Sequence, residues 1–344
     1  MKAMVMSAGK GTRLRPLSYT VPKPMFPIAG KPVIEHTLHL LKRHGIRDIT
    51  INLGKHSTLI EEHLLDGSAY GININYSREK TLLGTAGGVK KVESFFDGTF
   101  LVMSGDGLTD IDLKKALSFH KSKKALGTMV LKHADSRFEY GIALTKKDSR
   151  LTRFVEKPSW HEVFYDTVNT GIYIFEKEVF DYIPKNTFYD FGKDLWPLLL
   201  KKKKRIFAYV MDGYWTDIGN LKEYVAAQHD ALSGKIKLAI PGKRIGRNIW
   251  TGTGTRIDSS AKLTGPCIIG NNCIIEKNAL IGNFTVTGDG TRIGRNVKIE
   301  NCTVWKNVSI SQNTVLKNCI AGNGVRIPEN ISVFDGSILL PPET

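Results

Sequence analysis

A six-residue period that begins near residue 245 constrains the fold of this chain most strongly. Aliphatic residues recur in one register, and Thr287 fills the remaining slot: Ile257, Leu263, Ile269, Ile275, Ile281, Ile293 and Ile299. Four positions after each of the first seven register positions stands a small or β-branched residue: Ala261, Cys267, Cys273, Ala279, Thr285, Thr291 and Val297. The register slips by one residue before Val304, Ile310 and Leu316, and again before Ala321, Ile327 and Val333.

Such a repeat predicts a three-sided parallel β-helix. One aliphatic and one small residue of each rung point inward, the small position lets the chain turn at each corner, and stacked coils satisfy one another's backbone groups. We expect this domain over residues 245–344, after a linker over residues 232–244 that contains Gly, Lys and Pro.

The first 231 residues have a different texture, in which short apolar strands alternate with amphipathic helices. The strands that we expect are Met4–Met6, Ile49–Leu53, Phe100–Met103, Leu126–Leu131 and Thr170–Phe175. The helices that we expect are Val33–Arg43 and Leu113–Lys121. Alternation of this kind predicts an α/β domain with a mixed, mostly parallel sheet, whose ligands bind at the carboxyl ends of the strands. Two folding units also suit a chain of 344 residues.

Composition excludes some classes of protein and leaves others open. No apolar run approaches the roughly 20 residues that span a bilayer, and no signal peptide is visible, so we expect a cytoplasmic protein. The net charge of +16 does not distinguish nucleic acid, a membrane face or small polyphosphates as partners. The basic run Lys201–Arg205 follows an apolar stretch and is interpreted as a solvated helix end. The four cysteines contain no C-x-x-C pair and are interpreted as reduced packing residues.

The first predicted strand runs into a glycine-rich segment, Ser7–Pro16, which is followed by Pro22-Lys23-Pro24. Small residues directly after a strand let backbone N–H groups approach a phosphate closely, and nearby cations complete the site. The segment lacks the Gly-Lys-Ser/Thr ending of a P-loop and the third glycine of a dinucleotide fingerprint.

Two carboxylates stand in contexts that suit a metal ion. Asp106 ends a buried strand in Phe100–Asp106, and Asp217 lies in Gly213-Tyr214-Trp215-Thr216-Asp217-Ile218-Gly219. Mg²⁺ prefers oxygen ligands and often keeps one or two protein carboxylates beside phosphates and waters. The pair therefore predicts a magnesium site for chemistry on a triphosphate.

These motifs resemble the signature of the sugar-1-phosphate nucleotidyltransferases, in which a Rossmann-like domain can precede a left-handed β-helix. The resemblance implies that Asp106 and Asp217 bind Mg²⁺ and that Asp106 also lies in the nucleotide site. It implies that Arg13 and Lys23 lie along the triphosphate as catalytic cations. The phosphate loop would consist of Ala8, Gly9, Gly11 and Thr12. Ala8 departs from the glycine of many members but is small enough to keep the turn.

Further segments look like the sugar and base sites of the same family. Lys157, within Glu156-Lys157-Pro158, would neutralise the phosphate of the sugar 1-phosphate as a catalytic residue. The sugar-phosphate site would also contain Gly141, Glu156, Asn169 and Thr170. The segment with Gly84, Thr85 and Ala86 would lie along the base through backbone groups, although a glycine-rich helix start is the alternative interpretation.

The likeness extends over nearly the whole chain and is greatest to mannose-1-phosphate guanylyltransferases of the kind fused to a phosphomannomutase. It implies GTP and mannose 1-phosphate as substrates. We expect no nucleic acid or membrane partner. A β-helix ends in an open coil, and such domains tend to pack against copies of themselves, so we also expect a homo-oligomer. Thymidylyl, uridylyl or adenylyl transfer to glucose 1-phosphate stays open, as does a non-catalytic scaffold subunit of the same architecture. Acyl transfer on the β-helix is disfavoured because all nine histidines lie at or before His229.

Overall fold

The computed structural model describes residues 1–54, 58–133, 140–156 and 167–341. Contacts between residues divide the chain into two units. The first contains Met1–Lys10, Pro22–Met25 and Val33–Ile218, and the second contains Gly11–Val21, Phe26–Pro32 and Gly219–Thr344. No helix in the described ranges is long and apolar enough to cross a membrane.

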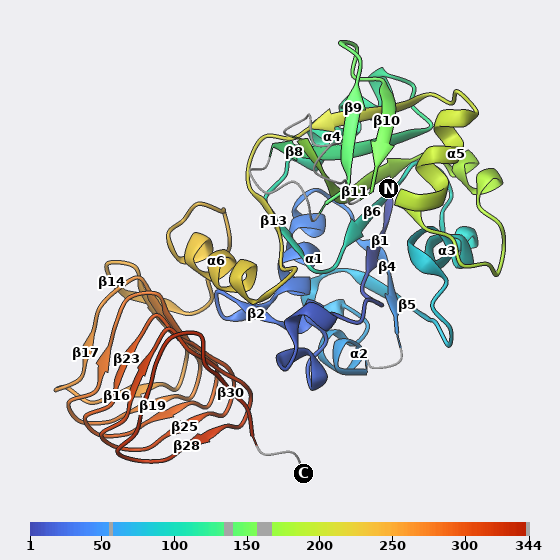
Figure 1. The fold of residues 1–344 in the computed structure, drawn as a ribbon. Coiled ribbons are helices and arrows are strands. Elements are labelled where there is room, and N and C mark those ends of the chain that lie inside the picture. The colour runs from blue at the N-terminus through green and yellow to red at the C-terminus, as the bar shows by residue number, and fades with distance from the viewer. Residues whose placement is uncertain (55–57, 134–139, 157–166, 342–344) are drawn as a thin grey trace. The chain divides into compact units, whose positions relative to one another are not determined.

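The first unit is built on a mixed sheet in the order β10-β9-β11-β6-β1-β4-β5, with β8 between β11 and β12 (Figure 1). Its strands are β1 Lys2–Met6, β4 Asp48–Leu53, β5 Asn73–Arg78, β6 Phe100–Ser104, β8 Gly127–His133, β9 Ile142–Thr145, β10 Leu151–Val155, β11 Thr167–Phe175 and β12 Ile206–Val210. Strands β6, β1, β4 and β5 run parallel, whereas β11 is antiparallel to both β6 and β8. The predicted mixed α/β sheet is confirmed.

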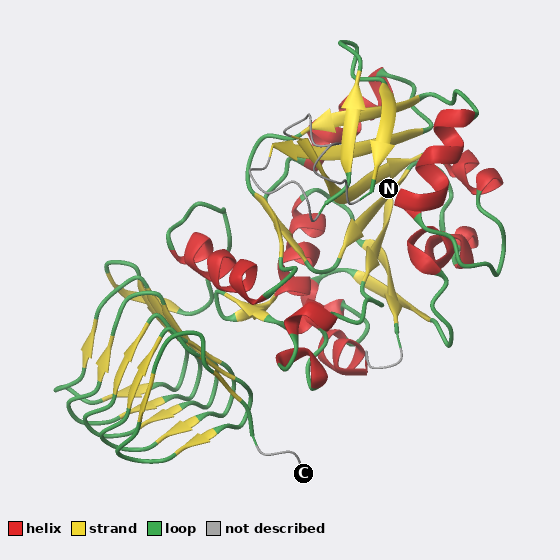
Figure 2. Ribbon diagram, in the orientation of Figure 1, coloured by secondary structure: helices red, strands yellow, loops and turns green. Residues whose placement is uncertain are grey.

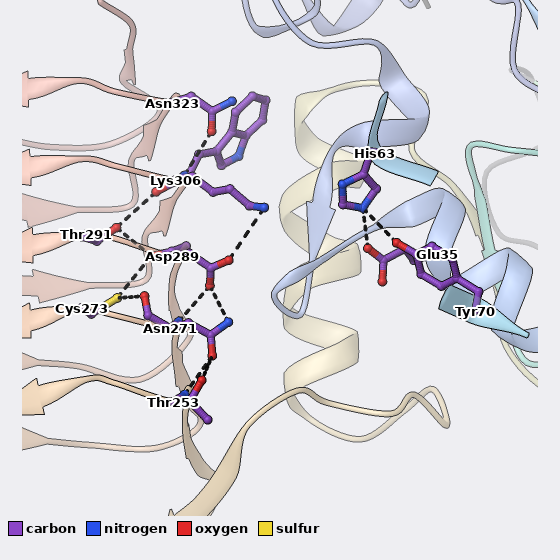
Figure 3. A network of polar contacts seen from close by, with 12 residues as sticks. Glu35, His63, Tyr70, Thr253, Asn271, Cys273, Asp289, Thr291, Lys306 and Asn323 are labelled. Carbon is purple, nitrogen blue, oxygen red and sulfur yellow. Dashed lines mark hydrogen bonds and ion pairs between the residues drawn. The ribbon is translucent and has the colours of Figure 1, made fainter. Parts of the chain in front are cut away.

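Helices flank this sheet on both faces (Figure 2). They are α1 Val33–Arg43, α2 Thr58–Leu64, α3 Gly84–Lys91, α4 Leu113–Ser122 and α5 Trp196–Lys201. Both predicted helices form, because each places apolar residues on a face that is buried against the sheet. The basic run after α5 is mostly exposed, as expected for a solvated helix end. A partly buried polar contact joins α1 to α2, where His63 Nε2 lies 2.6 Å from Glu35 Oε1 (Figure 3).

The second unit contains the predicted parallel β-helix, whose coils stack three sheets. The first sheet consists of β14 Lys243–Gly246, β15 Ile249–Thr251, β18 Cys267–Ile269, β21 Thr285–Thr287, β24 Thr303–Val304, β27 Ile320–Ala321 and β30 Ile338–Leu339. The second consists of β16 Arg256–Ile257, β19 Ile274–Ile275, β22 Arg292–Ile293, β25 Ser309–Ile310 and β28 Arg326–Ile327. The third consists of β17 Lys262–Leu263, β20 Leu280–Ile281, β23 Lys298–Glu300, β26 Val315–Lys317 and β29 Ser332–Val333.

The coil corners differ in one respect from the sequence interpretation. Six of the seven small residues are buried in the core, but at five of the corners the turn itself is made by the residue before the small one, which has a positive φ. Asn272 (φ 53°) precedes Cys273, and Asn296 (φ 57°) precedes Val297. Asparagine tolerates this left-handed conformation better than most residues do. The cysteines are free and buried, as expected for reduced packing residues.

Side chains at the corners form ladders from coil to coil. Nδ2 of Asn296 donates to Oδ1 of Asn313 at 2.9 Å, and Nδ2 of Asn313 donates to Oδ1 of Asn330 at 3.0 Å. A second ladder runs through Asn271 and Asp289 (Figure 3). Each polar side chain thus finds its partner one coil away, which fixes the register of stacking.

Helix α6 (Leu221–Leu232) and the hairpin of β2 (Pro27–Ile28) and β3 (Lys31–Pro32) also belong to the second unit. Nε1 of Trp305 on the β-helix donates to the hydroxyl of Tyr224 on α6 at 3.0 Å. That hydroxyl donates in turn to the carbonyl of Pro27 at 2.9 Å. Helix α6 thus has its contacts with the β-helix and is grouped with it from Gly219 onward, and the domain limits at residues 231 and 245 stay predictions.

Candidate functional site

A lysine lies between two carboxylates at the centre of the first unit. Nζ of Lys23 is 2.7 Å from Oδ2 of Asp106 and 2.6 Å from Oδ1 of Asp217. Only 10% of the Lys23 side chain is exposed, against 26% for Asp106 and 21% for Asp217. The structure thus brings together three of the residues that the sequence singled out, although they come from three distant segments.

Local structure explains why these segments meet. Asp106 is the second residue after β6, and the hydroxyl of Ser104, the last residue of that strand, donates to its Oδ1. Asp217 ends β13 (Trp215–Asp217), which pairs antiparallel with β7 (Gly107–Thr109) so that Asp217 lies opposite Gly107. This two-stranded ribbon holds the second carboxylate beside the first.

The charges of the cluster stabilise one another. Burial disfavours the ionised form of Asp106, but the Lys23 ammonium outweighs this effect and lowers the pKa of the carboxyl below 3.8. Burial also disfavours the charged form of Lys23, yet Asp106 and Asp217 together raise its pKa above 10.5. Lys23 and Asp106 are therefore both charged at neutral pH.

The donor set of this cluster suits a divalent metal ion only in company with a substrate. Two carboxylates are what Mg²⁺ commonly takes from a protein when phosphates and waters complete its octahedron. Within the described ranges, no group of three or more His, Cys, Asp or Glu side chains could hold a metal by itself. In this structure the ammonium group of Lys23 lies within 2.7 Å of both aspartates and offsets part of their negative charge.

The glycine-rich segment after β1 divides between the two units. Ala8 and Gly9 belong to the first unit, whereas Gly11, Thr12 and Arg13 belong to the second. Gly11 has a φ of 60° and precedes the short 3₁₀ turn Thr12–Leu14, on which Arg13 is exposed. A phosphate-binding role for these residues stays a prediction.

Ser7 carries a buried hydroxyl at the start of this segment. Its residue is 2% exposed, and within the described part of the chain its Oγ has no hydrogen-bond partner. A Cβ added to Gly105 would lie 2.4 Å from this oxygen, so the hydroxyl faces the turn that leads to Asp106. A buried polar atom without a partner often marks a place where water or a ligand binds.

The segment predicted to read the base is docked on the chain around residue 190. The amides of Ala86 and Gly87 both donate to the carbonyl of Tyr189, at 3.0 and 2.9 Å. The hydroxyl of Thr85 donates to Oδ2 of Asp190 at 2.8 Å. Gly84 begins helix α3 with a φ of 74°. Because these donors already have protein partners, the alternative interpretation as a glycine-rich helix start describes the segment's local structure.

In the predicted sugar-phosphate site, two glycines lie close to the carboxylate of Glu156. A Cβ would lie 2.7 Å from Glu156 Oε2 at Gly141 and 2.8 Å from the same oxygen at Gly192. Asn169 donates from Nδ2 to the hydroxyl of Tyr173 at 2.8 Å. The Thr170 hydroxyl is committed to the carbonyl of Val130 at 2.8 Å. Lys157 lies outside the described residues.

Sequence reasoning missed Asp190. Its Oδ1 accepts hydrogen bonds from the amides of Gly192 and Lys193 at the start of a π-helical turn, Phe191–Leu195. Such turns are rare and are frequently found at functional sites. An Asp that precedes Phe-Gly-Lys and an apolar run is a helix N-cap signal, so the sequence did contain a clue to it.

Comparison with known proteins agrees with this geometry. Residues 2–234 match the family model described as nucleotidyl transferase, and residues 246–341 match the model of the EIF2B subunit epsilon LbH domain. The chain belongs to the nucleotidyl transferase family. It is an enzyme of the class that acts on sugar 1-phosphates, as its curated relatives are. Members of this family generally use a divalent metal ion.

The relatives differ in the base and sugar that their names give. The chain is 38% identical to a UTP–glucose-1-phosphate uridylyltransferase of Synechocystis sp., over 87% of this chain and 86% of that protein. It is 32% identical to a mannose-1-phosphate guanylyltransferase of Mycobacterium tuberculosis, over 80% of this chain and 83% of that protein.

A solved structure shares the nucleotidyl transferase fold. It is a putative glucose-1-phosphate thymidylyltransferase from Bacillus anthracis in complex with a sucrose, with a TM-score of 0.62 and 25% identity. The match covers 70% of this chain and 97% of that chain. The reaction class is therefore established, whereas the substrate pair is not.

Proposed function

We propose that this nucleotidyltransferase joins GTP to mannose 1-phosphate, giving GDP-mannose and pyrophosphate. The observation that carries the site assignment is the approach of Lys23 to Asp106 and Asp217 at 2.7 and 2.6 Å. The substrate pair rests on the likeness of the middle segments to guanylyltransferases and on relatives of that name, including one from Gibberella zeae that is 31% identical over 100% of this chain and 93% of its own length.

The reaction is an in-line displacement at the α-phosphorus of the nucleotide. An oxygen of the sugar phosphate attacks, and pyrophosphate leaves. Because a phosphate monoester is already anionic near neutral pH, no general base is needed, and catalysis consists of positioning and charge neutralisation. A divalent ion held by Asp106 and Asp217 would supply part of that neutralisation at the phosphates.

The remaining charges would come from the chain itself. We assign Lys23 and Arg13 to the departing pyrophosphate and Lys157 to the phosphate of the sugar. Ala8, Gly9, Gly11 and Thr12 would form the phosphate loop. Glu156, whose carboxylate lies close to Gly141 and Gly192, is suited to accept hydrogen bonds from sugar hydroxyls. Asn169 and Thr170, from a separate motif, would complete the sugar-phosphate site. Gly84, Thr85 and Ala86 would border the base.

A second candidate is UTP with glucose 1-phosphate. The Synechocystis relative of that name is more similar to this chain than the guanylyltransferases described above, over a comparable share of the chain. Glucose 1-phosphate differs from mannose 1-phosphate only in the orientation of the 2-hydroxyl. A site that hydrogen-bonds the base edge should prefer one base by about tenfold or more, because a wrong base leaves buried polar groups unpaired at about 1 to 3 kcal/mol each.

One experiment decides between these pairs: kcat/KM for GTP, ATP, UTP and dTTP against mannose and glucose 1-phosphate, measured by pyrophosphate release with Mg²⁺. We expect GTP with mannose 1-phosphate to be the best pair. A tenfold advantage of UTP or dTTP with glucose 1-phosphate would replace the guanylyltransferase assignment but leave the reaction class unchanged. Absence of turnover with every pair would favour the scaffold alternative.

We also propose that the chain acts in the cytoplasm as a homo-oligomer whose contacts include the β-helix. A β-helix ends in an open coil with unpaired backbone groups, and such edges tend to pack against other chains. Light scattering of the full chain and of a chain that ends before residue 245 tests this assembly. An unchanged subunit number in the shorter chain would assign the contacts to the other unit.

A further inference from the structure

Three adjacent strands of the first unit end in buried polar residues that form one chain of hydrogen bonds. Ser7 follows β1, Asn52 lies near the end of β4, and Glu79 follows β5. The amide of Ser7 donates to Oδ1 of Asn52 at 2.7 Å, and Nδ2 of Asn52 donates to Oε1 of Glu79 at 2.8 Å. These residues are 2%, 1% and 5% exposed. The hydrogen bonds between them are therefore shielded from water.

The chain of bonds continues to the segment before helix α3. The amide of Leu83 donates to Oε2 of Glu79 at 2.9 Å. Glu79 thus connects two parts of the proposed nucleotide site, the turn that starts at Ser7 and the segment that starts at Gly84. These parts lie far apart in the sequence, and β1 pairs with β4 and β6 rather than with β5, the strand that leads to α3.

Helix α3 is shaped to admit this carboxylate. A Cβ at Gly88 would lie 2.7 Å from Oε1 of Glu79 and 3.3 Å from Nδ2 of Asn52. Glycine inside a helix destabilises it relative to alanine, and a buried carboxylate carries a desolvation cost as well. An apolar pair would fill the same space without either cost. The polar chain therefore fixes a geometry that simple packing would not specify.

We propose that Glu79 and Asn52 are positioning residues of nucleotidyl transfer. Together they set the separation between the phosphate loop and the segment that borders the base. The inference rests on the proposed nucleotide roles of Ala8–Thr12 and Gly84–Ala86. A nucleotide that spans both parts has its α-phosphate placed correctly only when this separation is correct.

The first test is Glu79→Gln. The amide has one acceptor oxygen, so the donors of Asn52 and Leu83 compete for it, and one of them faces the new NH₂ group. We expect kcat/KM for the NTP to fall about 10- to 100-fold, because misplacement by about 1 Å can cost that much. The ratio of kcat/KM between the best NTP and the other NTPs should fall as well. The KM for the sugar phosphate at saturating NTP should change by less than about twofold if the error lies on the nucleotide side.

The second test reverses the polarity of the pair with Asn52→Asp and Glu79→Gln together. The introduced carboxylate would accept from the Ser7 amide and from the side-chain NH₂ of the new glutamine, whose oxygen would accept from Leu83. All three bonds are restored, whereas Asn52→Asp alone would face two carboxylates toward each other. We expect the double variant to recover kcat/KM to within about fivefold of the original and to exceed both single variants, as coupled residues do in a double-mutant cycle.

Glu176→Gln is the matched control, because Glu176 accepts from Thr99 Oγ1 at 2.8 Å and lies 3.1 Å from His120 Nε2 in the same unit but touches neither nucleotide segment. For Glu176→Gln we expect a lower melting temperature with unchanged kcat/KM for the NTP. The proposal is overturned if Glu79→Gln behaves in the same way, or if the double variant is no better than the worse single variant. The original chain is assayed in parallel, so loss of its turnover would refute the proposed substrates instead. In that case calorimetry tests the inference through the Kd for the NTP. We expect weaker NTP binding to Glu79→Gln than to the original chain, the double variant or the control.

Discussion

The proposed active site and the β-helix reach specific geometry in opposite ways. At the site, Lys23 meets a carboxylate 194 positions away in the sequence. In the β-helix, each corner side chain bonds a residue 17 or 18 positions away, and the pattern repeats from coil to coil. The comparison teaches that the β-helix distributes its stability over many similar contacts. The proposed active site depends instead on a few contacts between distant segments, and no other contact can replace them.

The largest expected effect tests whether activity depends on these few residues. Asp106→Asn and Asp217→Asn should each lower kcat by at least about a hundredfold, which is about 2.7 kcal/mol of transition-state stabilisation. The reason is the loss of a metal ligand and of half the negative charge around Lys23. Steady-state pyrophosphate release measures it. Asp112→Asn is the control, because Asp112 caps α4 and asparagine caps equally well. Near-normal turnover of either variant would remove that residue from the site.

Removing the central cation tests whether the cluster is also a stabilising element. Lys23→Met leaves two partly buried carboxylates without their common partner, and we expect the free energy of unfolding to fall by about 2 to 3 kcal/mol at pH 7. Urea unfolding of both proteins measures the difference. A difference below about 0.5 kcal/mol, the size typical of a surface pair, would contradict the structural role.

The same variant gives a pH dependence with a definite sign. The pKa of Asp106 is lowered, so its contribution is present above the unfolded value of 3.8 and is lost as the pH falls through the folded value. The pKa of Lys23 is raised, so its contribution is present below 10.5 and is lost as the pH rises beyond that value. The stability difference between the original and Lys23→Met should therefore be flat from about pH 5 to 9 and shrink below about pH 3.8. A steady change across pH 5 to 9 would indicate another titrating group.

A smaller effect, on the free energy of unfolding, is expected at the hydrogen bond between Trp305 and Tyr224, which does not belong to the repeating contacts of the second unit. Trp305→Phe removes the donor to the Tyr224 hydroxyl, and both side chains are fully buried. We expect a loss of about 1 to 2 kcal/mol in the unfolding of this unit, because Tyr224 keeps its bond to Pro27. Trp250→Phe, at a half-buried position of β15, should cost less. Equal costs would mean that the hydrogen bond adds nothing to burial.

The smallest effect concerns one corner of the ladder. Asn296→Ala should cost about 1 kcal/mol, because alanine disfavours the φ of 57° and cannot bond Asn278 or Asn313. Asn296→Gly should cost less than alanine, since glycine adopts this conformation freely. Thermal unfolding compares the two, and kcat should not change in either. If alanine were tolerated better than glycine, the conformational explanation would be wrong.

Local pattern was enough to predict the elements near the site but not their contacts. The helix over Val33–Arg43 has the predicted bounds, because an apolar face repeats every three to four residues within it. Asp106 and Asp217 could be named from their strand-end contexts. Asn52 and Glu79 could not, because their partners lie in other segments and an isolated polar residue in or after a strand is common. Asp190 carried only the signal of a helix N-cap.

The sequence by itself determined the β-helix and the family, because a period of six residues and a glycine-rich motif are both visible within short windows. Only the tertiary structure decided that Lys23 lies between two aspartates, that α6 and the hairpin at Pro27 pack with the β-helix, and that Glu79 bonds to both Asn52 and Leu83. The physical reason is the separation in sequence between the residues that make each contact. Periodic burial is a property of neighbouring residues, whereas these contacts depend on how strands order themselves in a sheet, and no short window of sequence records that order.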